Sequence, residues 1–338
     1  MAKRKKYTTM KSKKIEPSVQ TISLSTPTVA AGTSENFYVD ISQCVSLLNR
    51  RFYRQGINWA VSSIKILSPQ VFQGAVTVGK LPNTWVMSNA WEKGFRAWQH
   101  MIKNSTDDQG LESIKGKFLD FKIYSDAAHH AAGYNANLLP IDNDGAAYTR
   151  GQWQPAEIEV PSTSGASSST AWELIAVGPS NPGVGASGLN AKSLIAGYAV
   201  SRALPDVVDP NVPDDASNVG ENWIMSLFTD GTEQDSDVIA MLEVTGDKAP
   251  YPYENDGTST DTMYPGGQNQ APALERHDSE YITGTTIGGT TRLRGGNFPC
   301  GLMKINLANA GSTSNVIIQI DLVPGTHRGY LCEPMTEM

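Results

Sequence analysis

Short segments of this chain alternate apolar and polar residues, and this period of two constrains the fold more than any other feature. The alternation, or an unbroken apolar run, is clearest over residues 19–24, 37–41, 57–66, 302–307 and 316–323. Apolar side chains at every second position predict strands that bury one face. Long connections rich in Gly, Pro, Ser, Thr and Asn separate the segments, and only 18% of residues are charged. This composition is typical of an all-β protein with two packed sheets or a closed barrel, and a helical bundle does not have it.

The segment 57–66 changes phase in its middle. Ile57, Trp59 and Val61 alternate, but the next apolar residues are Ile64 and Ile66. One extra residue in a strand shifts the alternation by one place. The sequence therefore predicts one long strand with a bulge.

A first helix is predicted over residues 42–55, with Val45, Leu48 and Phe52 on one face and Gly56 as its end. This helix carries three arginines with aromatic residues between them: Arg50, Arg51 and Arg54. A basic patch laced with aromatic residues is one way to bind nucleic acid. Cations favoured by the negative end of the helix dipole are an equally weighted alternative.

A second helix is predicted over residues 89–104. Asn89 is a good N-cap, and Glu92 three residues later makes a variant of the capping box. Four apolar residues then recur at helical spacing: Trp91, Phe95, Trp98 and Ile102. An aromatic stripe of this kind usually docks on a core, so we expect a helical insertion packed on the β body.

The first fourteen residues form a strongly basic arm. They contain seven cations and no carboxylate: Lys3, Arg4, Lys5, Lys6, Lys11, Lys13 and Lys14. The whole chain has 27 Lys+Arg against 34 Asp+Glu, so without the seven arm cations the rest would carry 20 against 34, a net charge of −14. A like-charged block with few apolar residues is predicted to be disordered when free. The arm indicates a polyanion partner, usually nucleic acid; a solvated tail or a nuclear-localisation signal is the alternative.

A glycine motif over residues 183–188 matches G-x-G-x-x-G, and Asp206 lies near the distance expected of a ribose-binding carboxylate. A dinucleotide site needs this motif to leave a strand directly and to open a helix. Residues 178–182 intervene, and no series of βα units surrounds the motif. A loop is therefore favoured over a nucleotide site.

The titratable residues form no recognisable catalytic or metal-binding pattern. His129 and His130 are adjacent, so their side chains diverge on either a strand or a helix. Residues 142–145 match only part of a calcium loop, and the acidic residues in 206–215 are expected in solvated loops or, alternatively, at a divalent ion between subunits. Without a nucleophile elbow, a P-loop or a zinc-protease helix, we predict no enzyme activity, no metal site and no cofactor.

The cysteines and the hydropathy pattern bear on the compartment. Cys44, Cys300 and Cys332 are odd in number and have no paired spacing, which favours buried thiols in a reducing compartment. No apolar segment follows the basic start as in a signal peptide, and no stretch has the length of a membrane span. We expect a soluble, intracellularly made protein with no membrane partner.

Three segments, residues 89–95, 293–302 and 322–329, carry a family resemblance. They resemble capsid proteins of smacovirus-like circular single-stranded DNA viruses that encode a replication initiator (CRESS-DNA viruses). The resemblance implies a single eight-stranded jelly roll and a small icosahedral T=1 shell of about 60 copies. It also implies that the basic arm binds the single-stranded DNA genome, and that the protein resides in a virion assembled inside the host cell.

The predicted organisation is an arm over residues 1–16 and a β body over residues 17–338, with long surface loops at about 126–170, 205–220 and 249–274. The predicted nucleic-acid contacts are the seven arm cations with Arg50, Arg51 and Arg54. A non-viral β-sandwich that binds carbohydrate or protein is the competing class.

Overall fold

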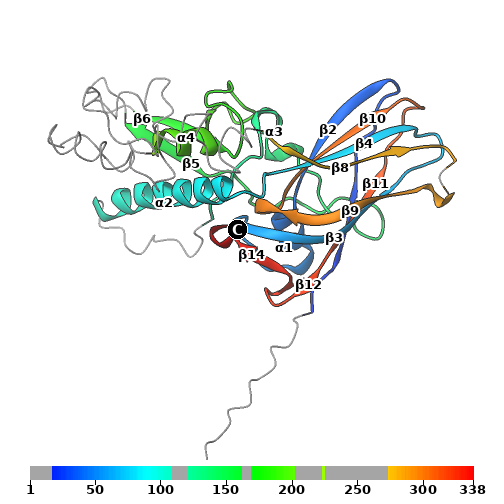
Figure 1. Cartoon of the computed structure of the whole chain (residues 1–338), viewed down its shortest axis with the longest axis horizontal. Coiled ribbons are helices and arrows are strands. Elements are labelled where there is room, and N and C mark those ends of the chain that lie inside the picture. Colours follow the sequence, from blue (N-terminus) through cyan, green and yellow to red (C-terminus); the bar gives the residue numbers. More distant parts are fainter. Residues whose placement is uncertain (1–16, 109–119, 162–168, 202–222, 225–272, 286) are drawn as a thin grey trace, which may run out of the picture.

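Two antiparallel β-sheets face each other, and a second layer of helices and short strands covers one end of them (Figure 1). The computed structural model describes residues 17–108, 120–161, 169–201, 223–224, 273–285 and 287–338. In the first sheet β1 pairs with β11, β11 with β3, and β3 with β9 and β14. The second sheet has the order β2-β10-β4-β8. The predicted antiparallel double-sheet architecture is therefore present as a β-sandwich.

Five strands of the two sheets lie where the alternation predicts them, at about residues 19–24, 37–41, 57–66, 302–307 and 316–323, and the alternation described above did not predict the other four. The bounds of all of them follow. The first sheet contains β1 (Thr21–Ser25), β3 (Ile57–Leu67), β9 (Thr290–Phe298), β11 (Ile317–Leu322) and β14 (Cys332–Pro334). The second contains β2 (Thr33–Asp40), β4 (Gly74–Lys80), β8 (Glu275–Ile282) and β10 (Leu302–Asn309). A short hairpin of β12 (Pro324–Gly325) and β13 (Gly329–Tyr330) follows β11.

The predicted bulge in β3 is confirmed. Val61 pairs with Leu322 of β11, but Ser63 pairs with Asp321, so Ser62 is the extra residue. The bulge lets Val61 and Ile64 both face the core between the sheets, where they are 4% and 0% exposed. This core takes its side chains from both sheets, among them Ile22, Leu24, Trp59, Ile305, Leu307, Ile318 and Ile320.

The first predicted helix is shorter than expected, and its predicted end at Gly56 is wrong. Helix α1 spans Ile41–Asn49, and its C-cap Arg50 has the left-handed φ of 53°. Asn49 Nδ2 donates to the carbonyl oxygen of Val45, and Ser46 Oγ accepts from the backbone N–H of Tyr53. Polar side chains thus hold the turn that ends the helix, a role that glycine more often takes.

The second predicted helix begins earlier than expected. Helix α2 spans Trp85–Asp108, and Thr84 Oγ1 accepts from the backbone N–H of Met87, so Asn89 is not its N-cap. The predicted docking of its aromatic stripe is confirmed. Trp91 and Trp98 are 6% and 9% exposed and belong to a second apolar core.

The second layer corrects the prediction that residues 126–170 form a long surface loop. They contain helix α3 (Ala127–Ala132) and strand β5 (Glu157–Pro161), which pairs with β6 (Ser169–Ile175). Strand β7 (Asn190–Ser193) runs parallel to β6, and helix α4 (Leu194–Ser201) follows it directly. Short 3-10 turns complete the described elements: η2 (Tyr134–Ala136), η5 (Ile287–Gly289), η6 (Pro299–Gly301) and η7 (Met335–Glu337).

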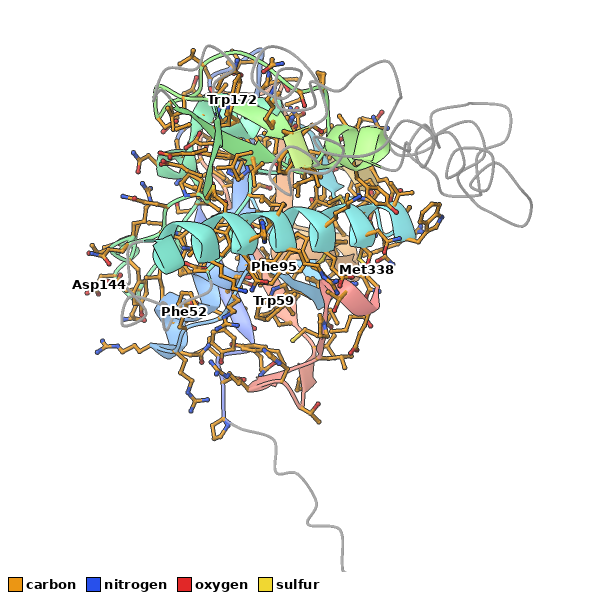
Figure 2. All side chains as sticks on the ribbon, turned by 90° about the vertical axis from the view of Figure 1, so that its left-hand side faces the viewer. Phe52, Trp59, Phe95, Asp144, Trp172 and Met338 are labelled. Carbon is orange, nitrogen blue, oxygen red and sulfur yellow. The ribbon has the colours of Figure 1, made fainter. Side chains whose placement is uncertain are left out.

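Helix α2 joins the two layers. Figure 2 shows it crossing the molecule between the sheet that carries Trp172 and the end of the sandwich that contains Trp59. Its stripe packs on Phe121, whose ring centroid lies 5.8, 5.5 and 5.6 Å from those of Trp91, Phe95 and Trp98. The loops predicted at 205–220 and most of 249–274 lie outside the described residues.

Trp98→Ala should lower the free energy of unfolding by about 3–5 kcal/mol, as truncations of buried Trp do. The reason is the cavity left between Phe95 and Phe121. Chemical denaturation of the purified variant measures it, with Tyr281→Ala as the matched control, because Tyr281 is 81% exposed. We expect the control to change the stability by less than about 0.5 kcal/mol. Equal effects of the two substitutions would contradict the docking of this stripe.

Candidate nucleic-acid interface

The basic arm, with its seven predicted contact residues, lies outside the described residues, but the segment that follows it is firmly held. The backbone N–H of Val19 donates to Asn49 Oδ1 (3.0 Å), and the Tyr330 hydroxyl donates to the carbonyl oxygen of Val19 (2.6 Å). Ser18 Oγ donates to the carbonyl oxygen of Gly329. The point where the arm joins the body is therefore fixed between the end of α1 and the β12–β13 hairpin.

The predicted arginines lie at this same end of the body. Arg50 caps α1, and Arg51 and Arg54 follow it; all three are exposed. The hairpin adds Arg328, which the prediction of contact residues missed. Arg328 Nη1 donates to the carbonyl oxygen of Phe52 (2.8 Å), and its own carbonyl oxygen accepts from the Tyr53 hydroxyl. We call Arg50, Arg51, Arg54 and Arg328 the arginine cluster.

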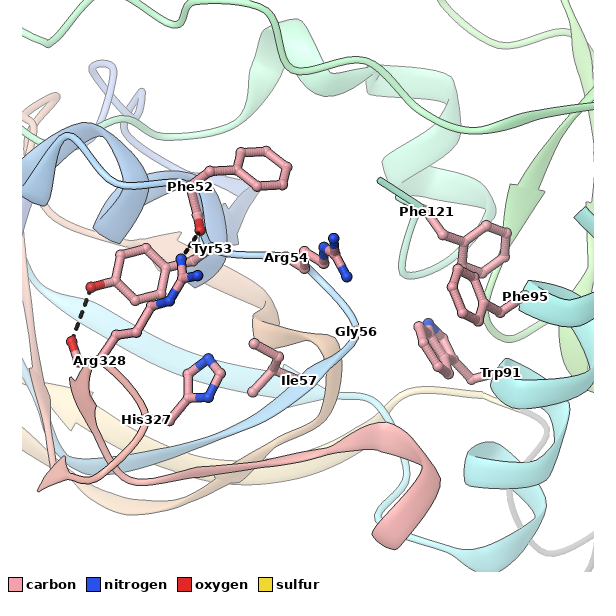
Figure 3. A pocket seen from close by; sticks show the side chains of 10 residues that line it. All are labelled: Phe52, Tyr53, Arg54, Gly56, Ile57, Trp91, Phe95, Phe121, His327 and Arg328. Carbon is pink, nitrogen blue, oxygen red and sulfur yellow. Dashed lines mark hydrogen bonds between the residues drawn. The ribbon is translucent and has the colours of Figure 1, made fainter. Parts of the chain in front are cut away.

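A pocket of about 530 Å³ opens beside the arginine cluster (Figure 3). Three parts of the chain line it: the turn after α1, helix α2 with the segment that follows it, and the β12–β13 hairpin. Its lining residues are Phe52, Tyr53, Arg54, Gly56, Ile57, Trp91, Phe95, Phe121, His327 and Arg328. We call it the aromatic pocket, because its far wall is built from the rings of α2 and Phe121.

The contact between Gly56 and Trp91 sets the shape of this pocket. A Cβ at Gly56 would lie 2.2 Å from Cζ2 of Trp91, so only glycine lets the two parts approach so closely. Trp91 stacks on Phe95 with ring centroids 5.1 Å apart and an interplanar angle of 20°. The pocket thus joins a flat aromatic wall to a cationic rim.

A buried carboxylate supports the turn that carries Arg54. Asp40 is fully buried; its Oδ1 accepts from the N–H of Gln43, and its Oδ2 accepts from Gln55 Nε2 and Trp153 Nε1. Burial raises the pKa of this carboxyl to about 6, although the three hydrogen bonds and Lys122 oppose the rise. Burial also lowers the pKa of Lys122 to about 8. The prediction of site residues missed Asp40. A sequence signal for it does exist, because a carboxylate that lies between an alternating segment and a segment of helical periodicity is typical of a helix N-cap.

The adjacent histidines are structural, each held by a different partner. His129 Nε2 lies 2.8 Å from Asn137 Oδ1, its ring stacks on Tyr38 with centroids 4.4 Å apart, and burial lowers its pKa to about 4. His130 Nε2 lies 2.9 Å from Glu173 Oε2. Both rings also pack edge-on against Tyr124, with centroids 5.1 and 5.2 Å from the centroid of its ring.

The glycine motif 183–188 has a packing role instead of opening a helix. It connects β6 to β7, and a Cβ at Gly185 would lie 2.5 Å from Nε2 of His130. In the partial calcium motif, Asp142 Oδ1 accepts from the backbone N–H groups of Asp144 and Ala146. Both motifs are therefore explained by local packing and turn formation.

The described part of the chain contains neither a metal-binding cluster nor a membrane-spanning helix. No group of three or more His, Cys, Asp or Glu side chains there is placed to hold a metal ion. None of the helices in the same residues is both long and apolar enough to cross a lipid bilayer.

The geometry defines an antiparallel β-sandwich with a helical side layer, a fixed arm junction, and an arginine cluster beside an aromatic pocket. Comparison with known proteins adds no relative: no protein-family model matches the chain, and neither a curated protein nor a solved structure matches it significantly.

Asp40 should make the stability of the folded chain fall as pH rises from 4 to 7. The pKa of its carboxyl rises from 3.8 to about 6 on folding, so the folded state binds the proton more tightly. This contribution is present below pH 4 and is lost as pH rises through 6, by up to about 3 kcal/mol. Urea unfolding of the wild-type chain and of Asp40→Asn at several pH values measures it.

The Asp40→Asn variant is the matched control, because groups that do not interact with Asp40 titrate alike in both chains. The stability of the wild type relative to the variant should therefore decrease between pH 4 and pH 7. A difference that stays flat or increases with pH would contradict the raised pKa.

Proposed function

We propose that this chain is a capsid subunit, which assembles with copies of itself into a small icosahedral shell and binds a circular single-stranded DNA genome through its basic arm. The strand order is the observation that carries the proposal. Strands β1–β4 pair with β8–β11 in reverse order. The pairs are β1 with β11, β2 with β10, β3 with β9 and β4 with β8. This nested pairing supports the proposal of an eight-stranded jelly roll, the fold that viral capsid subunits share with lectins and cupins.

The distribution of charge supports the second half of the proposal. The chain without its arm would carry −14, yet the arm junction lies beside the arginine cluster. The arm is therefore attached to an otherwise acidic protein next to four arginines of the body. Such a segregated basic surface attracts a polyanion. An inward-facing end would bring these cations to the genome.

The connections between strands support assembly through the second layer and the loops. The sandwich strands bury their inner faces in their own core. The long connection between β4 and β8 instead carries α2, α3, α4 and the three-stranded sheet of β5, β6 and β7. These elements offer surface that the β-sandwich does not need, and a shell requires such surface for contacts between subunits.

Purified full-length chain should form closed particles of uniform size, because a capsid subunit carries complementary contact surfaces on its own body. Size-exclusion chromatography followed by negative-stain electron microscopy measures this across salt concentrations and pH. A monodisperse monomer under all conditions would contradict the capsid proposal. It would favour the competing class, a non-viral β-sandwich that binds carbohydrate or protein.

Deletion of residues 1–14 should leave a folded subunit that has lost most of its affinity for single-stranded DNA. Seven arm cations on a single strand predict a slope of log affinity against log salt of about −5 for one engaged arm. The deletion should remove this contribution to the slope. Fluorescence anisotropy with a labelled oligonucleotide at several salt concentrations measures both quantities.

The matched variant replaces Arg50, Arg51 and Arg54 together by Gln and keeps the arm. Its slope should be smaller in magnitude by about 2, from three fewer phosphate contacts. An arm deletion that keeps the wild-type affinity and slope would show that the arm is not the genome-binding element.

A further inference from the structure

We propose that the aromatic pocket binds one unpaired base of the packaged single strand, while the arginine cluster holds the flanking phosphates. This inference rests on the proposed function and names the binding site on the body to which the arm delivers the strand. The pocket volume of about 530 Å³ lies within the range of small-ligand sites. The proposed occupant is a nucleotide with its base against the wall of α2.

The wall has the chemistry that stacking requires. Phe95 is the partly exposed ring of this wall, and the buried rings of Trp91 and Phe121 pack against it. Every nucleobase has a π-face that such an aromatic wall can bind. Trp91 also carries an unused donor: its Nε1 is buried and meets no hydrogen-bond acceptor among the described residues. Figure 3 shows this nitrogen on the ring edge that faces the space occupied by Arg54. A carbonyl oxygen or ring nitrogen of a base is an acceptor of the kind this donor lacks.

The rim has the charge that a phosphate requires. Arg54 and Arg328 enter the pocket from the turn after α1 and from the hairpin, on the side opposite the rings (Figure 3). Arg328 is held in place by its bonds with Phe52 and Tyr53, so it is already ordered before a ligand arrives. An apolar wall facing two guanidinium groups matches a nucleotide, which has an apolar face at one end and an anion at the other.

The position of the pocket links it to the arm. Its hairpin wall contains His327 and Arg328, and the next residue, Gly329, accepts hydrogen bonds from Ser18 and Gln20. The arm junction therefore lies next to the hairpin wall of the pocket, and a strand bound by the arm would start close to it. Bases in a duplex are stacked on each other and cannot enter, so the pocket selects single strands without reading their sequence.

Two oligonucleotides with equal numbers of phosphates test the proposal on the full-length chain. A 20-nucleotide strand of thymidines should bind about tenfold more tightly than a strand of abasic residues of the same length, as measured by fluorescence anisotropy at constant salt. Phe95→Leu keeps an apolar side chain but removes the ring, and should reduce this ratio to less than twofold. Tyr281→Leu, a change of the same kind on exposed β8, is the matched control and should keep the tenfold ratio.

A second measurement uses the unaltered chain and does not depend on the folding of a variant. Strands with 5-iododeoxyuridine crosslink to aromatic side chains that they contact, and mass spectrometry of the digested complex locates the crosslinks. Crosslinks to Trp91, Phe95 or Phe121 are expected. Crosslinks confined to the arm, or equal binding of the two oligonucleotides, would overturn the pocket and leave the packaging function standing. Failure of both oligonucleotides to bind would overturn the packaging function as well.

Discussion

The buried carboxylate of Asp40 is the interaction on which the functional end of this molecule depends. It ends β2, caps α1, and accepts hydrogen bonds from Gln55 and Trp153, which come from two further segments. An isolated buried charge is very costly, so this site is stable only while all three donors are present. Gln55 extends this hydrogen-bond network to Ile123, because its Nε2 donates to the Ile123 carbonyl oxygen and its Oε1 accepts from the Ile123 N–H. One polar centre thus fixes the relative positions of the sandwich, α1 and the segment after α2.

The direction of α1 follows from that cap, and the cationic surface follows from α1. A helix of nine residues that starts at Asp40 places Asn49 against Val19 and the Tyr330 hydroxyl. The left-handed turn at Arg50 then sends the chain back toward Gln55, and the arginines project from this short return. The cluster is therefore built on a turn held at both ends, and two of its members, Arg54 and Arg328, belong to segments that packing holds in place.

The sequence predicts the sandwich well because the evidence for it is local. Alternation over β1, β2, β10 and β11 requires only a window of six residues, and the bulge at Ser62 appears as a slip of phase. The helix boundaries were less predictable. Thr84 caps α2, although the sequence pattern favoured Asn89 as its N-cap. Arg50 ends α1 in a left-handed conformation that glycine usually adopts.

The candidate site was predictable only in parts. Arg50, Arg51 and Arg54 are neighbours in the sequence, but Arg328 joins them through a contact to Phe52 across 276 positions. No window of sequence contains such a contact. The same holds for the aromatic pocket, because the turn after α1, helix α2 with Phe121, and the β12–β13 hairpin are far apart in the sequence.

The packing of α2 against the sandwich also forms the aromatic pocket. The ring of Trp91 lies so close to Gly56 that a single added Cβ would push α2 away from the sandwich. The same ring belongs to the second apolar core, which includes β5, β6 and α4 residues, so moving it disturbs that whole layer. The packing that holds α2 on the body therefore also forms the wall of the pocket. The pocket needs no ligand to assemble it, which keeps the ordering cost of binding low for whatever base the arm delivers.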